Sequence, residues 1–518
     1  MPAPNPPIRD ARPELRPGDA ALARFRSAVA RTDALIERSN TPEGKTPAEI
    51  RARAELRLRR VRRFLAWLGD PQDAYPIVHV GGTSGKGSTS AAIAAILSAG
   101  GYKVGLHTSP YLQVATEKLQ ADGRLIDPNV FALLVDEVLE AHDAWRRANP
   151  GDDQLTYGEV WVALLTTYFR RERVDLAVIE VGAGGRFDLT NVVQPVAAVV
   201  TSVGLDHTVT LGETIPEIAW HKAGIVKAGA AAVTAVADPM AYAVIAAEAE
   251  RAGASLVRVI PGETFEVVET SPEGTIWREL RVNASGGRIV EAPLPAPPGR
   301  FQATNAATAV ATVRQLAARG FPVTEDAIRA GLAAARLPGR FERMPDVVPV
   351  VLDGAHNPEK VGALAADLPS LVGRGETRHV IVVLGALESK RHDEMVRSLE
   401  PHAAELVTTS PHVLAKPGAA AADLGATART IGFGGRLTVE PDPATALERA
   451  LERARATGGT VLVTGSLYLI GNVRGRWYPD EAIVLERTSW PGTERSTHAG
   501  GTGETVETFG SGIPRGER

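Results

Sequence analysis

The fold of this 518-residue chain is decided by one stretch in its first half, residues 77–89, which read IVHVGGTSGKGST. The short apolar run before the glycines predicts a buried strand, and the residues after Lys86 begin a helical pattern. Glycines let backbone N–H groups approach phosphate oxygens closely, and the start of a helix adds its dipole. The stretch therefore predicts a phosphate-binding loop between a strand and a helix.

The residue types in this loop suit a nucleotide with Mg²⁺. Lys86 would neutralise the outer phosphates, and a hydroxyl group of Ser88 or Thr89 would help to hold the ion. The standard pattern, GxxxxGK followed by Ser or Thr, is not met, because Val80 and Gly87 take its first glycine and its hydroxyl position. The alternative is a glycine-rich turn with a surface lysine, but the flanking strand and helix favour phosphate binding.

Similar apolar runs recur along the rest of the chain, and they predict an α/β fold. They are continuous rather than alternating, which is typical of a parallel sheet covered on both faces. Residues 88–99 end before two glycines and suit a crossover helix of such a sheet. The runs are residues 77–80, 176–181 and 196–203 in the first half, and 348–352, 380–384, 405–408 and 461–464 in the second.

The second half repeats the strand–helix pattern after residues 338–341, so we expect two domains with a boundary near residue 340. The first would span residues 46–338 and the second, smaller one residues 342–485. Residues 1–45 are expected to be a mostly disordered or loosely packed extension, and residues 486–518 a disordered tail. The first 20 or so residues are polar and rich in proline, and residues from about 489 onward have few large apolar side chains.

Composition narrows the classes of function. The chain has no cysteine, which excludes disulfides, thiolate zinc sites and a cysteine nucleophile. A net charge of -4 gives no electrostatic reason to expect nucleic acid or a membrane surface as partner. No apolar stretch is long enough to span a membrane, and the N-terminus lacks a signal-peptide core. We expect a cytoplasmic monomer.

The stretch 79–89 closely resembles the signature loop of folylpolyglutamate synthases and dihydrofolate synthases, which belong to the Mur ligase superfamily, although Ser84 replaces the usual Asn. The resemblance extends in the same order over about residues 50–475. It implies a Mur-ligase-like P-loop ATPase domain followed by a smaller Rossmann-like α/β domain. The further matching segments are residues 106–112, 180–188, 204–207, 218–227, 299–307, 338–341, 353–358, 385–390 and 463–468.

The resemblance implies which residues bind ATP and which carry the chemistry. Lys86, Lys222 and Arg340 would be catalytic, with Arg340 reaching the phosphates from the linker between the domains. An arginine can stabilise charge on a transferring phosphoryl group. The ATP-binding residues would be Gly82, Thr83, Ser84, Gly85, Lys86, Gly87, Ser88, Thr89, Gln302, Asn305, Arg340, Asp353 and His356.

The same resemblance implies two Mg²⁺ ions, held by Ser88, Ser109, Glu180, His207 and a carbamylated Lys222. Glu180 ends an apolar strand, where open sheets place ligands, and a buried carboxylate there needs a cation. Its alternative is an ion pair with Arg186. His207 rests on the resemblance, because imidazole is not a favoured magnesium ligand. The alternative for Lys222 is a solvated helix lysine, and His221 stands beside it where the family has Glu.

The implied activity is ATP- and Mg²⁺-dependent addition of L-glutamate to dihydropteroate or a reduced folate through an acyl phosphate. Ser109, Thr156 and Tyr157 would bind the folate. Two departures border that site: Gly158 replaces an aromatic residue that could stack on a pterin, and Tyr111 replaces a histidine. The alternatives are a related acid–amine ligase for a non-folate acid, and a P-loop nucleotide-binding module without ligase activity.

Overall fold

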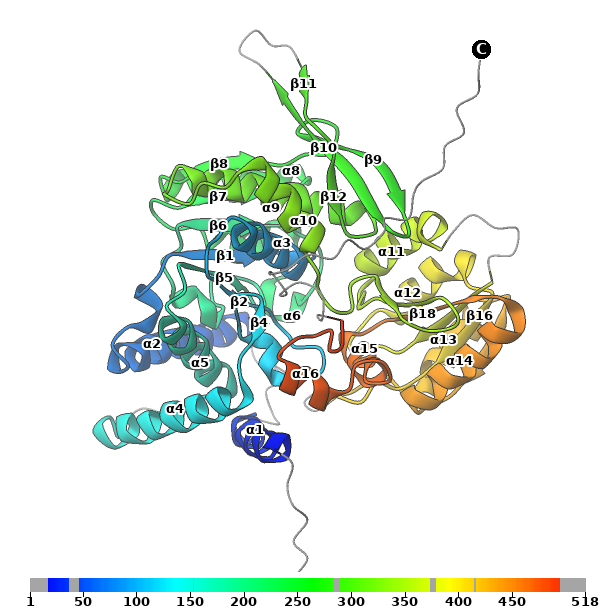
Figure 1. Cartoon of the computed structure of the whole chain (residues 1–518), viewed down its shortest axis with the longest axis horizontal. Helices are drawn as coiled ribbons and strands as arrows, with labels where there is room; N and C mark the ends of the chain where they lie inside the picture. The colour runs from blue at the N-terminus through cyan, green and yellow to red at the C-terminus, as the bar shows by residue number, and fades with distance from the viewer. Residues whose placement is uncertain are drawn as a thin grey trace, which may run out of the picture.

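Strand β1 (Ile77–Gly81) lies inside an eight-stranded sheet, and the glycine-rich loop follows it directly. The computed structural model describes residues 17–36, 46–151, 153–282, 288–372, 379–413 and 416–493 (Figure 1). The other strands of this sheet are β2 (Val104–His107), β3 (Gln120–Ala121), β4 (Arg124–Leu125), β5 (Leu176–Glu180), β6 (Ala197–Val200), β7 (Ala231–Thr234) and β8 (Ser255–Arg258). Their order is β4-β3-β2-β5-β1-β6-β7-β8, and only the pairs of β3 with β2 and with β4 are antiparallel.

Successive residues of β1 pack against helices on opposite faces of the sheet, as the strand's alternation requires. Val78 and Val80 share a core with α3, α9 and α10, whereas Ile77 shares one with α1, α2, α4 and α5. Helices α7 and α8 pack on Ala198 and Val200 of β6. The helix bounds are α1 (Pro17–Asp33), α2 (Pro47–Trp67), α3 (Lys86–Ala99), α4 (Pro128–Ala148), α5 (Tyr157–Glu172), α7 (Ile215–Ala223), α8 (Pro239–Arg251), α9 (Arg300–Ala317) and α10 (Glu325–Ala334).

An antiparallel ribbon, which the sequence did not lead us to expect, separates β8 from α9. It consists of β9 (Phe265–Ser271), β10 (Gly274–Val282), β11 (Arg288–Val290) and β12 (Leu294–Ala296), with β10 pairing the other three. Figure 1 shows the β10–β11 end of this ribbon extending away from the first sheet. Its base is buried, with Trp277 fully enclosed.

The second sheet begins after α10 and confirms that the chain contains a second α/β unit. Its strands are β13 (Glu342–Met344), β14 (Val350–Leu352), β15 (Val380–Leu384), β16 (Glu405–Thr408), β17 (Arg436–Val439) and β18 (Thr460–Thr464). The order is β13-β14-β18-β15-β16-β17, and every pair except β13–β14 is parallel. The helices are α11 (Pro358–Leu371), α12 (His392–Leu399), α13 (Ala421–Thr430), α14 (Pro443–Thr457), α15 (Leu467–Arg474) and α16 (Asp480–Glu486).

Parts of both chain ends are more ordered than the sequence suggests. Within the segment 1–45, residues 17–33 form α1, and its apolar side chains Leu22 and Phe25 are buried against α4. Arginines between these apolar positions hide their helical spacing from a reading of composition. Within the expected tail, residues 488–493 pack back onto the second unit, with Ser489 buried. Residues 1–16, 37–45 and 494–518 lie outside the described ranges.

The remaining helical elements are short. They are α6 (Thr208–Leu211) and the 3-10 turns η1 (Pro71–Asp73), η2 (Ala115–Lys118), η3 (Leu189–Val192) and η4 (Glu400–His402). Within the ranges that the structure describes, no helix has the length and apolar character needed to cross a membrane.

Candidate active site

A cavity of about 2020 Å³ lies where the glycine-rich loop leaves β1, and residues of both α/β units line it. In open parallel sheets ligands bind beyond the carboxyl ends of the strands, which is where this cavity opens. Most residues selected from the sequence line it, although they are far apart along the chain. They are Gly82 to Ser88, Ser109, Thr156, Tyr157, Glu180, His207, Lys222, Asn305, Arg340, Asp353 and His356.

Two of the selected residues do not reach this cavity. Thr89 is completely buried in α3, and its hydroxyl oxygen has no hydrogen-bond partner among the described residues. Gln302 is also buried, and it lines a second cavity of about 270 Å³, which shares Ser88, Asn305 and Arg340 with the first. The structure therefore gives Gln302 an indirect part in the site, through its hydrogen bond to Asn305.

The glycine-rich loop is held by the segment that follows β6. The Ser84 N–H donates to the Ser202 hydroxyl at 2.8 Å, and the Thr201 hydroxyl donates to the Ser84 carbonyl at 2.6 Å. Gly82 has φ +150, and a Cβ atom there would lie 1.9 Å from the Thr201 hydroxyl oxygen. A side chain at Gly82 would therefore separate the loop from the segment that shapes it.

Asn305 of α9 lies directly against the same loop. Gly85 caps α3 with φ +82, and a Cβ atom there would lie 2.3 Å from Asn305 Oδ1. The Asn305 side-chain amide donates to Gln302 Oε1 at 2.9 Å, which orients it. Asn305 thus places its side-chain amide against the loop, and Gln302, one helical turn before it, holds that amide in place.

Glu180 is a buried carboxylate at the end of β5, and it faces the loop. It accepts a hydrogen bond from the Ser109 N–H at 2.9 Å, and burial raises the pKa of its carboxyl group. A Cβ atom at Gly87 would lie 3.4 Å from Glu180 Oε2, so the loop passes close to this carboxylate. The alternative partner, Arg186, instead forms an ion pair with Glu248 at 2.9 Å.

Lys222 is not a solvated helix lysine. Its side chain is buried in α7, and burial, followed by the charge of Lys86, lowers its pKa to about 7. Among the described residues no carboxylate forms an ion pair with it. His207 lies on the same cavity, where it caps α6 in a left-handed conformation with φ 53.

The donor set fits Mg²⁺ only in combination with a nucleotide. Within the described part of the chain, no group of three or more His, Asp or Glu side chains is arranged to hold a metal ion. Glu180 supplies one carboxylate, and the buried Ser109 hydroxyl beside it has no hydrogen-bond partner in the described ranges. Mg²⁺ commonly uses one or two carboxylates with substrate phosphates and water, so this sparse set is compatible with it.

Arg340 of the linker and Asp353 of the second α/β unit also line the cavity. Asp353 is buried, and it accepts hydrogen bonds from the N–H groups of Phe341 and Ala355, each at 2.8 Å. Burial raises the pKa of its carboxyl group. Because Phe341 follows Arg340, this carboxylate fixes the linker turn that carries the arginine into the cavity.

His356 is enclosed by polar partners of its own unit. Its Nδ1 atom lies 2.8 Å from the Gly354 carbonyl oxygen, and its Nε2 atom lies 3.0 Å from Lys360 Nζ. Burial, followed by the positive charge of Lys360, holds the pKa of this histidine well below its ordinary value. Both causes favour the neutral form of the imidazole.

A polar bridge that the sequence did not reveal joins the two units across the cavity. Lys390 Nζ lies 2.9 Å from Asp206 Oδ1, and the Asn357 side-chain amide donates to Asp206 Oδ2 at 3.2 Å. Lys360 also lines the cavity, and burial lowers its pKa to about 7. The sequence placed Asp206, Asn357 and Lys390 in three separate segments that match the family, but nothing in those segments indicated that the three side chains meet.

Aromatic rings and a buried ammonium group form another part of the cavity wall. Lys118 Nζ lies 4.9 Å from the ring centre of Tyr157 and 3.9 Å from that of Trp161. Thr156 accepts a hydrogen bond from Arg57 at 2.8 Å, and its hydroxyl donates to Glu159 at 2.7 Å. Lys118 was missed from the sequence because nothing near it in the chain marks it as a site residue.

Gly158 lies against the side chain of Leu189. A Cβ atom there would lie 2.8 Å from Leu189 Cδ1, the end of a flexible side chain that could turn aside to admit a small residue. Tyr111 borders the same part of the cavity, and burial raises the pKa of its phenol to about 12. This wall therefore keeps aromatic character from Tyr111 and Tyr157 without a ring at position 158.

Models of two protein families match the chain. The Mur ligase middle domain matches residues 80–313, and the Mur ligase glutamate ligase domain matches residues 339–467. The folylpolyglutamate synthase of Lacticaseibacillus casei is 38% identical over 345 residues, which cover 66% of this chain and 78% of that one. The dihydrofolate synthase/folylpolyglutamate synthase of Bacillus subtilis is 35% identical over 425 residues, covering 81% and 94%.

Solved structures resemble the whole architecture. Mycobacterium tuberculosis folylpolyglutamate synthase complexed with ADP has a TM-score of 0.76 at 29% identity, covering 89% of this chain and 99% of that one. E. coli FolC in complex with DHPP and ADP has a TM-score of 0.70 at 30% identity, covering 87% and 97%.

Proposed function

This chain belongs to the folylpolyglutamate and dihydrofolate synthases of the Mur ligase family, and we propose that it joins L-glutamate to dihydropteroate or a reduced folate. It is an ATP-dependent acid–amino-acid ligase that forms ADP. One observation carries the proposal: a single cavity brings together a phosphate-binding loop, a buried carboxylate, a linker arginine and an aromatic wall.

The reaction has two steps. A carboxylate of the acceptor acid attacks the γ-phosphorus of ATP, which gives an acyl phosphate and releases ADP. The amine of L-glutamate then attacks the acyl carbon, so that an amide forms and phosphate leaves. The protein contributes mainly position and charge, because phosphoryl transfer asks for little covalent help.

Individual residues supply those contributions. Lys86 at the start of α3 would bind the outer phosphates together with the N–H groups of the loop. Arg340 would approach the transferred phosphoryl group from the linker, whose turn Asp353 holds. Asn305 would contact the nucleotide beside Gly85.

Mg²⁺, when bound, would neutralise charge on the phosphates and on the attacking carboxylate. We assign its binding to Glu180, Ser109, Ser88, His207 and Lys222, with room for two ions. A positively charged Lys222 would repel the metal, but its pKa near 7 leaves much of the amine neutral. A neutral amine reacts with carbon dioxide to give a carbamate, whose oxygens suit Mg²⁺.

Closure of the second unit over the first would protect the acyl phosphate from water. The Asp206–Lys390 ion pair and the Asn357–Asp206 hydrogen bond join the two units, and all three residues line the cavity. These contacts support a ligase over a module that only binds nucleotide, because such a module needs no second unit at its phosphate loop.

The acceptor acid would lie against Tyr157, Thr156 and the loop that carries Ser109. A flat pterin could pack on the rings of Tyr111 and Tyr157. Because these two rings already line the cavity, a pterin would have aromatic contacts without a ring at position 158.

The purified chain, incubated with ATP, Mg²⁺ and L-glutamate, tests the proposal. Dihydropteroate and a reduced folate are supplied separately, ADP release is followed by a coupled assay, and the amide product by mass spectrometry. We expect product with at least one acceptor, no turnover by Lys86→Ala, and normal turnover by Lys103→Ala, a lysine outside the cavity that pairs with Glu172. No acceptor-dependent ADP release would contradict the folate proposal, and ADP without amide would favour the nucleotide module.

A further inference from the structure

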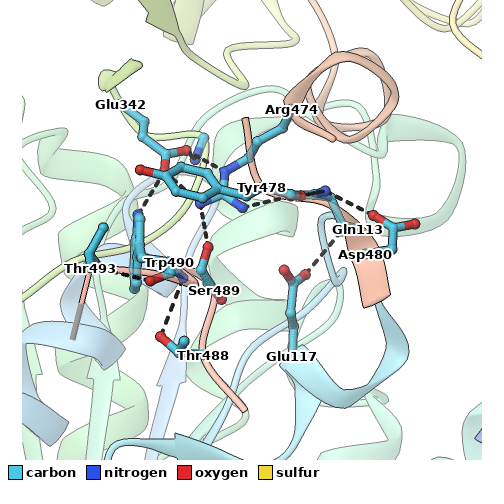
Figure 2. Close-up of polar contacts among 11 residues, drawn as sticks. Gln113, Glu117, Glu342, Arg474, Tyr478, Asp480, Thr488, Ser489, Trp490 and Thr493 are labelled. Atoms are coloured by element: carbon cyan, nitrogen blue, oxygen red, sulfur yellow. Dashed lines mark hydrogen bonds and ion pairs between the residues drawn. The ribbon is translucent and has the colours of Figure 1, made fainter. Parts of the chain in front are cut away.

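Arg474, the last residue of α15, is fully buried although its guanidinium group is charged. Its Nε atom donates to Glu342 Oε2 at 2.9 Å, and its Nη2 atom donates to Glu342 Oε1 at 2.7 Å. A buried charge is costly unless it is paired and its donors are satisfied, so this bidentate pair is tightly specified. Figure 2 shows the pair at the centre of a polar cluster.

The cluster joins three segments that are distant along the chain. Arg474 Nη1 donates to the Gln113 side-chain oxygen at 2.6 Å, and Arg474 Nη2 also donates to the Ser489 carbonyl at 2.7 Å. Gln113 belongs to the first unit, whereas Glu342 lies just after the linker and Ser489 lies in the C-terminal segment. Figure 2 shows Gln113 and Glu342 on either side of the Arg474 guanidinium group.

Gln113 ends the loop that begins with Ser109, and both ends of its side-chain amide are engaged. Its Nε2 atom donates to the Tyr478 carbonyl at 3.0 Å and to Asp480 Oδ1 at 2.9 Å. Within the first unit, Glu117 accepts hydrogen bonds from the backbone N–H groups of Leu112 and Gln113. The loop is thus held between its own unit and the C-terminal unit.

Glu342 fixes the linker in the same way. Its Oε2 atom also accepts a hydrogen bond from the Gly339 N–H at 2.8 Å, and its Oε1 atom accepts one from Trp490 at 2.8 Å. Gly339 has φ +67 and directly precedes Arg340, so the carboxylate sets the turn from which the arginine enters the cavity. Arg474 therefore contacts both the end of the loop that begins with Ser109 and the carboxylate that holds the turn before Arg340.

Close backbone packing strengthens this connection. A Cβ atom at Gly471 of α15 would lie 2.2 Å from the Leu112 carbonyl oxygen, so the helix rests directly on the loop. A Cβ atom at Gly339 would lie 3.5 Å from the Leu112 side chain. The loop and the linker consequently meet α15 on adjoining surfaces, with the Arg474 side chain between their polar groups.

We propose that Arg474 is a positioning residue for the ligation reaction, which ties the 109–113 loop to the 338–342 linker and so sets the Ser109 side of the cavity relative to Arg340. The proposal rests on the ligase function for its consequence, but the tie itself is a property of the fold. A purely structural ion pair would affect stability alone, whereas this tie would also affect how the acyl phosphate is shielded.

Hydrogen–deuterium exchange of the full chain tests the tie without any reaction. In Arg474→Lys, which keeps the charge but loses the forked geometry, exchange in residues 109–113 and in residues 338–342 should both rise about tenfold. Gln113→Leu should raise exchange in residues 109–113 only, because the Arg474–Glu342 pair stays intact. Arg453→Gln, which breaks an Arg–Glu pair with Glu405 away from the cavity, should change neither segment.

The reaction supplies the second readout, the ratio of ADP released to amide formed, measured well below the melting temperature. We expect a ratio near one for the wild type and Arg453→Gln, and a rise of at least about twofold in Arg474→Lys and Gln113→Leu as water reaches the acyl phosphate. The proposal would be overturned if Arg474→Lys and Gln113→Leu both left hydrogen–deuterium exchange unchanged. It would also be overturned if the variants remained active with an unchanged ratio of ADP released to amide formed. A wild type without acceptor-dependent ADP release would instead overturn the ligase function, and exchange would still decide the tie.

Discussion

Gly85→Ala tests whether the phosphate loop needs the close approach of Asn305. Gly85 has φ +82, a conformation that L-residues rarely adopt, and an added Cβ atom would lie 2.3 Å from Asn305 Oδ1. The alanine must therefore push the Asn305 amide away or shift the start of α3. Either movement displaces a nucleotide contact that the proposed function requires.

Gly101→Ala is the matched control, because it follows the other end of the same helix. Gly101 has φ +90, and a Cβ atom there would meet nothing within 4 Å. Both variants should lose about 1–2 kcal/mol of folding stability from the left-handed backbone. Gly85→Ala should lose about 1 kcal/mol more, because Asn305 gives up its hydrogen bond to Gln302.

The assay is steady-state ADP release at varied ATP, with melting temperatures measured alongside. A lost nucleotide contact of about 1.4 kcal/mol corresponds to a roughly tenfold rise in the KM for ATP. We expect that rise for Gly85→Ala and an unchanged KM for Gly101→Ala at a temperature where both are folded. Equal KM values for ATP in the two variants would refute the reasoning, because the left-handed backbone that both positions share would then account for the effects of both substitutions.

Three further predictions concern the charged groups of the cavity. Glu180→Gln should raise the Mg²⁺ concentration for half-maximal activity about tenfold, because Mg²⁺ prefers a charged oxygen ligand; an unchanged Mg²⁺ dependence would exclude Glu180 as a ligand. Lys222→Ala should be inactive. Added acetate or formate should restore at least about a tenth of the wild-type activity, because either acid can place a carboxylate where the carbamate would lie. If neither acid restores activity, the result would count against the carbamate. Burial lowers the pKa of Lys118 from 10.5 to about 7, so the folded chain binds fewer protons than the unfolded chain between these values and gains stability as pH rises through that range. Lys118→Met should therefore flatten the rise of the melting temperature between about pH 7 and pH 9, and an unaltered slope would contradict the buried position of this amine.

The central strands and the phosphate loop could be predicted because each is a local pattern. The apolar runs at 77–80 and 380–384 are buried strands of the two sheets, since a strand covered on both faces needs apolar residues throughout. The antiparallel ribbon and α1 escaped prediction for the opposite reason. Their apolar positions alternate with charged ones, so composition alone resembles that of exposed segments.

Many residues of the candidate site could also be identified from motifs, but the contacts between their side chains could not. Lys118, with no signal beside it in the sequence, is placed against Tyr157 and Trp161 only by packing. The ion pair between Asp206 and Lys390 depends on how the two units meet. Such contacts join residues whose separation along the chain carries no information about their distance in space.

By itself, the sequence determined that this chain has an α/β fold with a phosphate loop, because glycines, a lysine and a helix start act within a dozen residues. It also placed Glu180, Lys222, Arg340 and Asp353 among the residues of interest. Only the tertiary structure decided that Glu180 faces Ser109 rather than Arg186, and that Asp353 holds the linker turn. The physical reason is that burial, charge pairing and close backbone approach arise when distant segments pack together, and no local pattern encodes them.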